Sequence, residues 1–79
     1  MEDTDVLGNI QRLVDEERRL RDELSHDSQP ATRERLKRIE VQLDQCWDLL
    51  RQRRGLRHAG VDPDEARPRD PGTVERYVQ

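Results

Sequence analysis

Residues 36–50, LKRIEVQLDQCWDLL, show the clearest periodicity in the chain. Apolar side chains recur there every three or four residues, at Leu36, Ile39, Leu43, Cys46, Trp47 and Leu50. This spacing is typical of one stripe on an α-helix, whereas a half-buried strand would alternate. Val41 and Leu49 fall off the centre of the stripe. The pattern predicts an amphipathic helix over residues 29–59, with Gly60 as the residue that ends it.

The N-terminal part of the chain repeats this periodicity. One seam position holds Val6, Leu13 and Leu20, and the other holds Ile10, Glu17 and Leu24. These positions predict a helix over residues 4–25. Between the two helices, the polar run SHDSQP at residues 25–30 contains a proline and indicates a tight turn. Residues 1–60 are therefore expected to form an all-α, antiparallel helical hairpin.

Glu17 is the one charged residue in the predicted seam. An unpaired carboxylate is costly in an apolar environment. Two interpretations stay open at this point. Glu17 pairs with an arginine of the second helix or of a dimer mate, or the stripe rotates so that Glu17 faces water.

Residues 61–79 differ in character from the hairpin, because they hold three of the four prolines. The run Asp62-Pro63-Asp64-Glu65 predicts a capping residue followed by one helical turn. Residues 73–78 favour one last turn, with Val74, Tyr77 and Val78 near one face. We interpret the region as an extended C-terminal arm that ends in an apolar cluster.

The composition argues against an enzyme. The chain has 79 residues, of which 42% are charged and 30% apolar, with no phenylalanine, so a large core around a deep pocket is excluded. No Gly-rich phosphate loop is present, and no Ser or Cys stands at a usable spacing from a base. Glu23 and His26 have the Glu-x-x-His spacing of di-iron bundles, but His26 falls in the predicted turn. We expect no catalytic residues, no cofactor and no metal.

The single cysteine, Cys46, excludes an internal disulfide, and it faces the predicted core beside Trp47. A lone thiol fits a reducing compartment. Acidic residues follow Met1, where a signal peptide would be basic, and no apolar run reaches the roughly 20 residues of a membrane helix. We therefore expect a cytoplasmic protein without membrane contact.

One hairpin cannot cover all of its apolar residues. The apolar stripe widens to include Leu7, Val14, Trp47 and Leu49, and two helices cannot cover both of its flanks, so one flank is left open. Burying that flank against a second copy would produce a homodimeric four-helix bundle. An unidentified protein partner would serve the same purpose.

The end of the second helix is basic, with Arg51, Arg53, Arg54, Arg57 and His58 and no acid before Asp62. Several interpretations are open: a solvated helix end, arginines that bind the acids of the arm, a protein-binding site, or a nucleic-acid-binding site. A formal net charge of −3 and the lack of stacking aromatics disfavour nucleic acid. The hypothesis is a non-enzymatic protein acting by self-association or protein binding, with nucleic-acid association as the alternative. These basic residues, Trp47 and Tyr77 are the candidate interaction residues.

The central run LDQCWDLLRQRR, residues 43–54, is distinctive. Together with EERRLR at residues 16–21 and AGVDPDEA at residues 59–66, it resembles a small actinobacterial family, the domain of unknown function 2630. The resemblance covers nearly the whole chain. It implies a short, mostly helical protein from an actinobacterium, and it implies no activity. Gly55 departs from the pattern, because a helix former is expected there.

Overall fold

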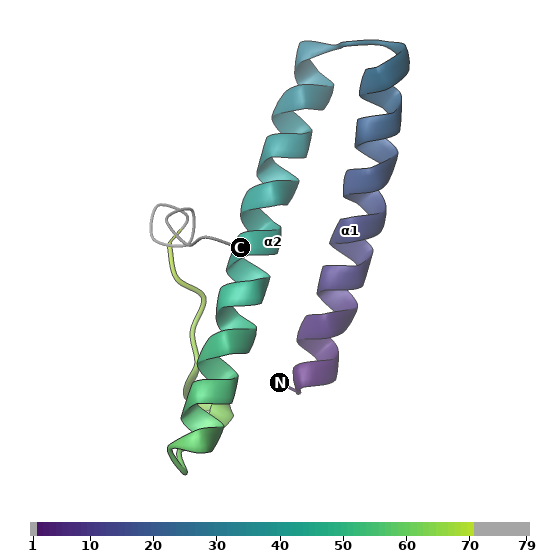
Figure 1. Ribbon diagram of the computed structural model, residues 1–79. Coiled ribbons are helices and arrows are strands. Elements are labelled where there is room, and N and C mark those ends of the chain that lie inside the picture. Colours follow the sequence, from purple (N-terminus) through teal and green to yellow (C-terminus); the bar gives the residue numbers. More distant parts are fainter. Residues whose placement is uncertain (1, 71–79) are drawn as a thin grey trace.

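Two antiparallel helices dominate the computed structural model, which describes residues 2–70. Helix α1 (Asp3–His26) and helix α2 (Pro30–His58) pack side by side, and a short 3₁₀ turn, η1 (Pro63–Glu65), follows (Figure 1). Residues 2–70 contain no strand. The all-α, two-helix prediction is confirmed, and each helix end differs by one residue from the expected ranges of 4–25 and 29–59.

Specific capping interactions fix the helix ends. The backbone N–H of Glu2 donates to Asp5 Oδ2 at 2.9 Å, which satisfies a donor at the start of α1. Pro30 opens α2, where a backbone N–H has no intrahelical partner.

Gly60 terminates α2, as the sequence predicts. Gly60 has φ of 74°, a left-handed conformation that favours glycine. The N–H of Val61 donates to the carbonyl of Leu56 at 2.8 Å, and that of Gly60 to the carbonyl of Arg57 at 3.2 Å. This pair of bonds is a Schellman motif, and it reverses the direction of the chain.

The core lies between the two helices. Its buried members are Val6, Ile10, Leu13 and Leu20 from α1 and Ile39, Leu43, Leu49 and Leu50 from α2. Val14, Leu36, Cys46 and Ala66 are half-buried against it. All of these except Ala66 occupy predicted stripe or flank positions, so the helical periodicity identified most of the core.

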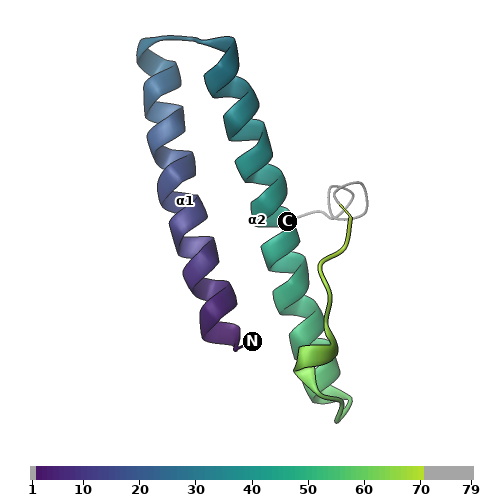
Figure 2. The same ribbon diagram turned by 180° about the vertical axis from the view of Figure 1, so that it is seen from behind.

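The arm, residues 61–70, folds back along the outer side of α2 (Figures 1 and 2). Gln52 holds it in two ways, donating from Nε2 to the carbonyl of Arg67 at 2.7 Å and accepting the Arg67 N–H at 3.4 Å. Further along, Gln45 Nε2 donates to the carbonyl of Arg69 at 3.2 Å. The expected apolar cluster of Val74, Tyr77 and Val78 lies outside the described residues.

The position of the arm corrects one expectation about the apolar flank. Leu49 belongs to the apolar stripe that a single hairpin was not expected to cover fully, yet its side chain is only 7% exposed to solvent. Pro68 lines the same hollow as Leu49 and Cys46, and Ala66 packs on the core. The arm therefore covers one flank of the hairpin and leaves the other open. Within residues 2–70, neither helix is apolar enough over a sufficient length to cross a lipid bilayer.

Candidate functional site

A buried arginine ties three parts of the chain together where α1 begins. Arg53 Nε donates to Asp3 Oδ1 at 2.6 Å, and Arg53 Nη1 donates to Asp64 Oδ1 at 2.8 Å. Arg57 Nη2 donates to the second oxygen of Asp3 at 2.8 Å. We call Asp3, Arg53, Arg57 and Asp64 the Arg53 clasp. It joins the start of α1, the last turns of α2 and the arm.

The clasp favours the charged forms of Asp3, Asp64 and Arg53. The hydrogen bond from Arg53 lowers the pKa of Asp3, and the bond from Arg57 lowers it further. The hydrogen bond from Arg53 also lowers the pKa of Asp64. The two carboxylates in turn raise the pKa of Arg53, the Asp3 hydrogen bond contributing most. A charged side chain as buried as Arg53, only 6% exposed, is tolerable because both its neighbours are anions.

This geometry divides the predicted basic cluster. Arg53 is not part of a solvated helix end, because its side chain is buried in the clasp. The arm acid Asp64 does bind an arginine of the basic cluster, Arg53, so the interpretation in which arginines bind the acids of the arm holds for this pair. Arg51, Arg54 and His58 are exposed on α2.

Asp48 is a buried carboxylate to which the sequence analysis assigned no role. It is 2% exposed, accepts a hydrogen bond from Gln52 Nε2 at 2.9 Å and lies 3.4 Å from Arg69 Nε. The signal was a second polar stripe on α2, formed by Gln45, Asp48 and Gln52 at helical spacing. The arm binds this stripe.

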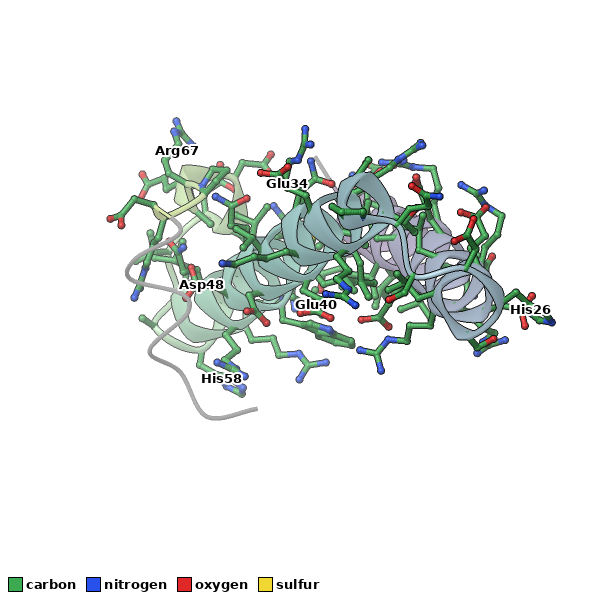
Figure 3. The ribbon with its side chains drawn as sticks, turned by 90° about the horizontal axis from the view of Figure 1, so that it is seen from above. His26, Glu34, Glu40, Asp48, His58 and Arg67 are labelled. Carbon is green, nitrogen blue, oxygen red and sulfur yellow. The ribbon has the colours of Figure 1, made fainter. Side chains whose placement is uncertain are left out.

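The opposite flank of the hairpin is not covered by any part of residues 2–70. We call it the open face, and define it by two rows of residues seven apart: Leu7, Val14 and Arg21 on α1, and Glu40, Trp47 and Arg54 on α2. Leu7 is 45% exposed and Trp47 is 38% exposed. An open hollow of about 360 Å³ runs between the rows and is lined by Val14, Glu17, Glu40, Leu43, Asp44 and Trp47. In Figure 3, Glu40 and His58 lie on the opposite side of the hairpin from Arg67 of the arm.

Glu17 belongs to this open face and resolves the ambiguity of the seam. Its side chain is 23% exposed and pairs with Arg21 of its own helix at 3.3 Å. Arg21 also lies 3.3 Å from Glu40 of α2. Neither sequence interpretation holds as stated, because the arginine comes from α1 and the carboxylate lies at the edge of the core. The three residues link the helices near the turn.

The thiol and the histidines form no evident chemical site. Cys46 is half-buried, and burial raises the pKa of its thiol. His26 is the last residue of α1 rather than part of the turn, and its Nδ1 lies 2.9 Å from the carbonyl of Asp22. Across residues 2–70, no three His, Cys, Asp or Glu side chains gather in a way that could hold a metal ion. Tyr77, the remaining candidate, lies outside the described residues.

Comparison with known proteins supports the resemblance seen in the central run. Residues 2–79 match the family described as "Protein of unknown function (DUF2630)". Uncharacterized proteins of Mycobacterium bovis and of two strains of Mycobacterium tuberculosis are 51% identical over 78 residues, which covers 96% of this chain and 90% of each relative. No solved structure matches the chain. The chain belongs to the DUF2630 family, whose members in these actinobacteria share its sequence over nearly their whole length.

Proposed function

We propose that this protein is non-enzymatic and acts by binding a helical polypeptide through its open face. The observation that carries the proposal is the exposure of Trp47 beside Val14 and Leu43 around one continuous hollow. Exposed large apolar residues that cluster on one face mark interaction sites more often than scattered ones do. Tryptophan is also among the residues that contribute most to binding energy in protein interfaces.

The position of the open face supports this proposal. Its rows lie next to the buried seams at seven-residue spacing, the positions that contact neighbouring helices in a four-helix bundle. A partner bound to this face would bury Leu7 and Trp47 and complete an apolar core that one hairpin leaves partly exposed to solvent. Residues 61–70 of the arm do not fill this role, because they lie on the other flank.

The experiment compares two exposed apolar residues that lie in different parts of the structure. Leu7 lies on the open face, whereas Val61 is 38% exposed at the start of the arm. Leu7→Lys should weaken association of the purified protein, measured by analytical ultracentrifugation, while Val61→Lys should leave it unchanged. The fluorescence of Trp47 should shift to shorter wavelength as the wild-type protein associates. Association that is insensitive to Leu7→Lys contradicts the proposal.

Nucleic-acid association is the alternative, and it rests on the exposed Arg51, Arg54 and His58. The clasp weakens this alternative, because Arg53 and Arg57 already bind carboxylates. A titration of DNA and RNA binding against salt distinguishes the two functions. Phosphate contacts must weaken steeply as salt rises, whereas binding through an apolar face is much less sensitive.

A further inference from the structure

We propose that the occupant of the open face is a second copy of this chain, packed antiparallel about a two-fold axis beside Trp47. The arrangement pairs Glu40 of each copy with Arg54 of the other. This inference rests on the proposed function and specifies its partner and geometry. It follows from the spacing of charges along α2 and from the side on which the arm lies.

The spacing of the α2 row is symmetric about its tryptophan. Glu40 lies seven residues before Trp47 and Arg54 lies seven residues after it. At 1.5 Å per residue, each charge is about 10 Å from Trp47 along the helix axis. A two-fold axis through Trp47 and perpendicular to α2 therefore brings Glu40 of one copy to the level of Arg54 of the other.

The rest of the face follows the same polarity. Acidic residues lie on the side of Trp47 nearer the turn, where Glu17, Glu40 and Asp44 line the hollow and Arg21 pairs with Glu17 and Glu40. Basic residues lie on the other side, where Arg51, Arg54 and His58 are exposed. Antiparallel packing brings acidic ends onto basic ends, whereas parallel packing brings like charges together. Complementary charges of this kind determine orientation and suppress the wrong arrangement.

The α1 row provides the apolar part of the contact. Arg21 lies beside Glu40, and Val14 lines the same hollow as Trp47. Because α1 and α2 are antiparallel, a step of seven residues toward the start of α1 corresponds to a step of seven residues toward the end of α2. Starting from Val14 and Trp47, this step places Leu7 at the level of Arg54. At the axis, Val14 and Trp47 of one copy face the same residues of the other. Two tryptophans at the centre of a charged rim give the apolar core and polar periphery of a specific interface.

The symmetry of the pattern favours a second copy over an unrelated partner. A two-fold interface uses the same patch on both subunits, so the patch must be complementary to its own rotated image. The rows of the open face meet this condition, with opposite charges at equal distances from an apolar centre. A different partner would place no such demand on the spacing. Residues 61–70 of the arm do not cover the face, since they bind the other side of α2 (Figure 3).

Exchanging the two charges tests the arrangement in the full-length protein. In an antiparallel dimer, Glu40→Arg creates two Arg–Arg contacts and Arg54→Glu creates two Glu–Glu contacts. Each single variant should weaken dimerisation about tenfold or more at low salt, and the loss should shrink at high salt. The double variant Glu40→Arg/Arg54→Glu should recover affinity to within about threefold of wild type, because it restores opposite charges at both contacts.

Matched controls exclude general effects of charge. Glu34 and Arg38 are exposed on α2 and line a hollow with Val41, away from the open face. Glu34→Arg and Arg38→Glu repeat the two charge changes there and should leave the dimer affinity unaltered. Circular dichroism of each variant checks helix content, and the recovery of the double variant shows that loss of the Arg21 pair is not the cause.

The outcomes separate this inference from the proposed function. A monomer at every concentration overturns the inference, and so does a dimer whose affinity none of the charge changes alters. A dimer that Leu7→Lys weakens but Glu40→Arg and Arg54→Glu do not affect still uses the open face, so only the antiparallel arrangement fails. In a parallel dimer Glu40 would face Glu40 and Arg54 would face Arg54, so each single change would replace one like-charge contact by another. The double variant would then bind no more tightly than the single variants.

Discussion

Arg53 shows how a single side chain can hold elements that are far apart in the sequence. Its guanidinium presents several N–H donors in one plane, so it reaches Asp3 with Nε and Asp64 with Nη1 at the same time. A lysine would offer one compact charge and could not reproduce this fork. The burial of Arg53 is therefore linked to its two partners, and the loss of either carboxylate leaves a charge poorly compensated.

Acid should weaken the clasp. Asp3 and Asp64 both have a pKa below their ordinary value of 3.8 in the folded protein, because Arg53 binds their charged forms. As pH falls, the unfolded chain therefore takes up protons before the folded chain does. The stability that the clasp provides should be complete above about pH 5 and should be lost as pH falls through 3.8 toward the folded-state pKa values.

Urea unfolding between pH 7 and pH 2.5 measures this loss. In a plot of the free energy of unfolding against pH, the acid limb is the part below about pH 5 where stability falls. Asp3→Asn and Asp64→Asn should each make this limb less steep. In an Arg53→Gln background the same substitutions should have a smaller effect on the limb, since the largest cause of both lowered pKa values is gone, while Arg57 still binds Asp3. An acid limb that Asp3→Asn leaves unchanged would show that this carboxylate is not part of the linkage.

Cys46 should be protected from thiol reagents in the folded protein. The side chain is half-buried on the flank that Pro68 covers, and burial raises its pKa, so the reactive thiolate is scarce. Labelling at pH 8 should be at least about tenfold slower in the native protein than in urea. A Ser25→Cys variant in a Cys46→Ala background supplies the accessible reference, because Ser25 is exposed. Equal rates for the two thiols would place Cys46 at the surface.

Sequence reasoning at this scale succeeded for residues whose chemistry matches their location. Leu20 and Leu50 are apolar, lie on a stripe and are buried. It failed for Asp48 and Arg53, because a charged side chain normally indicates a solvated face. Arg53 is buried against partners 50 and 11 residues away in the sequence, and Asp48 lies against Arg69 of the arm, so no local pattern reveals their burial.

At the scale of elements, two glycines on and after α2 have opposite structural roles. Gly55 lies inside the helix, and an added Cβ would meet nothing within 4 Å. Gly60 has equally open space around it, but its φ of 74° is strained for any other residue. The two positions therefore separate helix propensity from backbone conformation.

Alanine at each glycine should change stability in opposite directions. Gly55→Ala should raise the free energy of unfolding by about 1 kcal/mol, because glycine weakens a helix interior by that amount. Gly60→Ala should lower it by about 1–2 kcal/mol through left-handed strain at the helix end. Thermal and urea unfolding of both variants measure the difference. Destabilisation by Gly55→Ala would mean that the glycine has a role in packing or binding.

The helix ends illustrate what local sequence can predict about elements. Gly60 as the end of α2 and the turn at Asp62-Pro63-Asp64 both appear as expected, and the Asp62 side chain accepts the N–H of Asp64 at 3.0 Å. These features depend on residues within one turn of one another. The path of the arm over Leu49 depends instead on a chain reversal and on contacts with Gln45 and Gln52, so it could not be predicted from periodicity.

The contribution of the arm to the core can be measured through Leu49. Leu49→Ala should lower the free energy of unfolding by about 2–5 kcal/mol in the full chain, because the residue is buried. The same substitution should cost distinctly less in a chain that ends at Gly60, where the arm no longer covers the site. Leu50→Ala is the control, since Leu50 lies on the inner stripe and should cost a similar amount in both chains. Equal Leu49 costs in both chains would show that the arm does not cover it.

The whole molecule is a hairpin with two unlike flanks. The arm occupies one flank through backbone carbonyls that accept from Gln45 and Gln52, and the other flank carries Trp47 and Leu7 at the surface. The sequence predicted the hairpin and its shortage of apolar cover. It could not assign the arm to one flank, because both flanks of α2 carry apolar residues next to charged ones.

The Arg53 clasp also bears on the order in which the chain folds. It joins residues 50 positions apart, whereas the turn between α1 and α2 spans only residues 27–29. Closing a long loop costs more entropy than closing a short one, so helix pairing should start at the turn and reach the clasp last. Arg53→Gln should then speed unfolding and leave the refolding rate nearly unchanged in stopped-flow experiments, whereas Leu24→Ala near the turn should slow refolding. Slower refolding of Arg53→Gln would instead show that the clasp forms before the transition state.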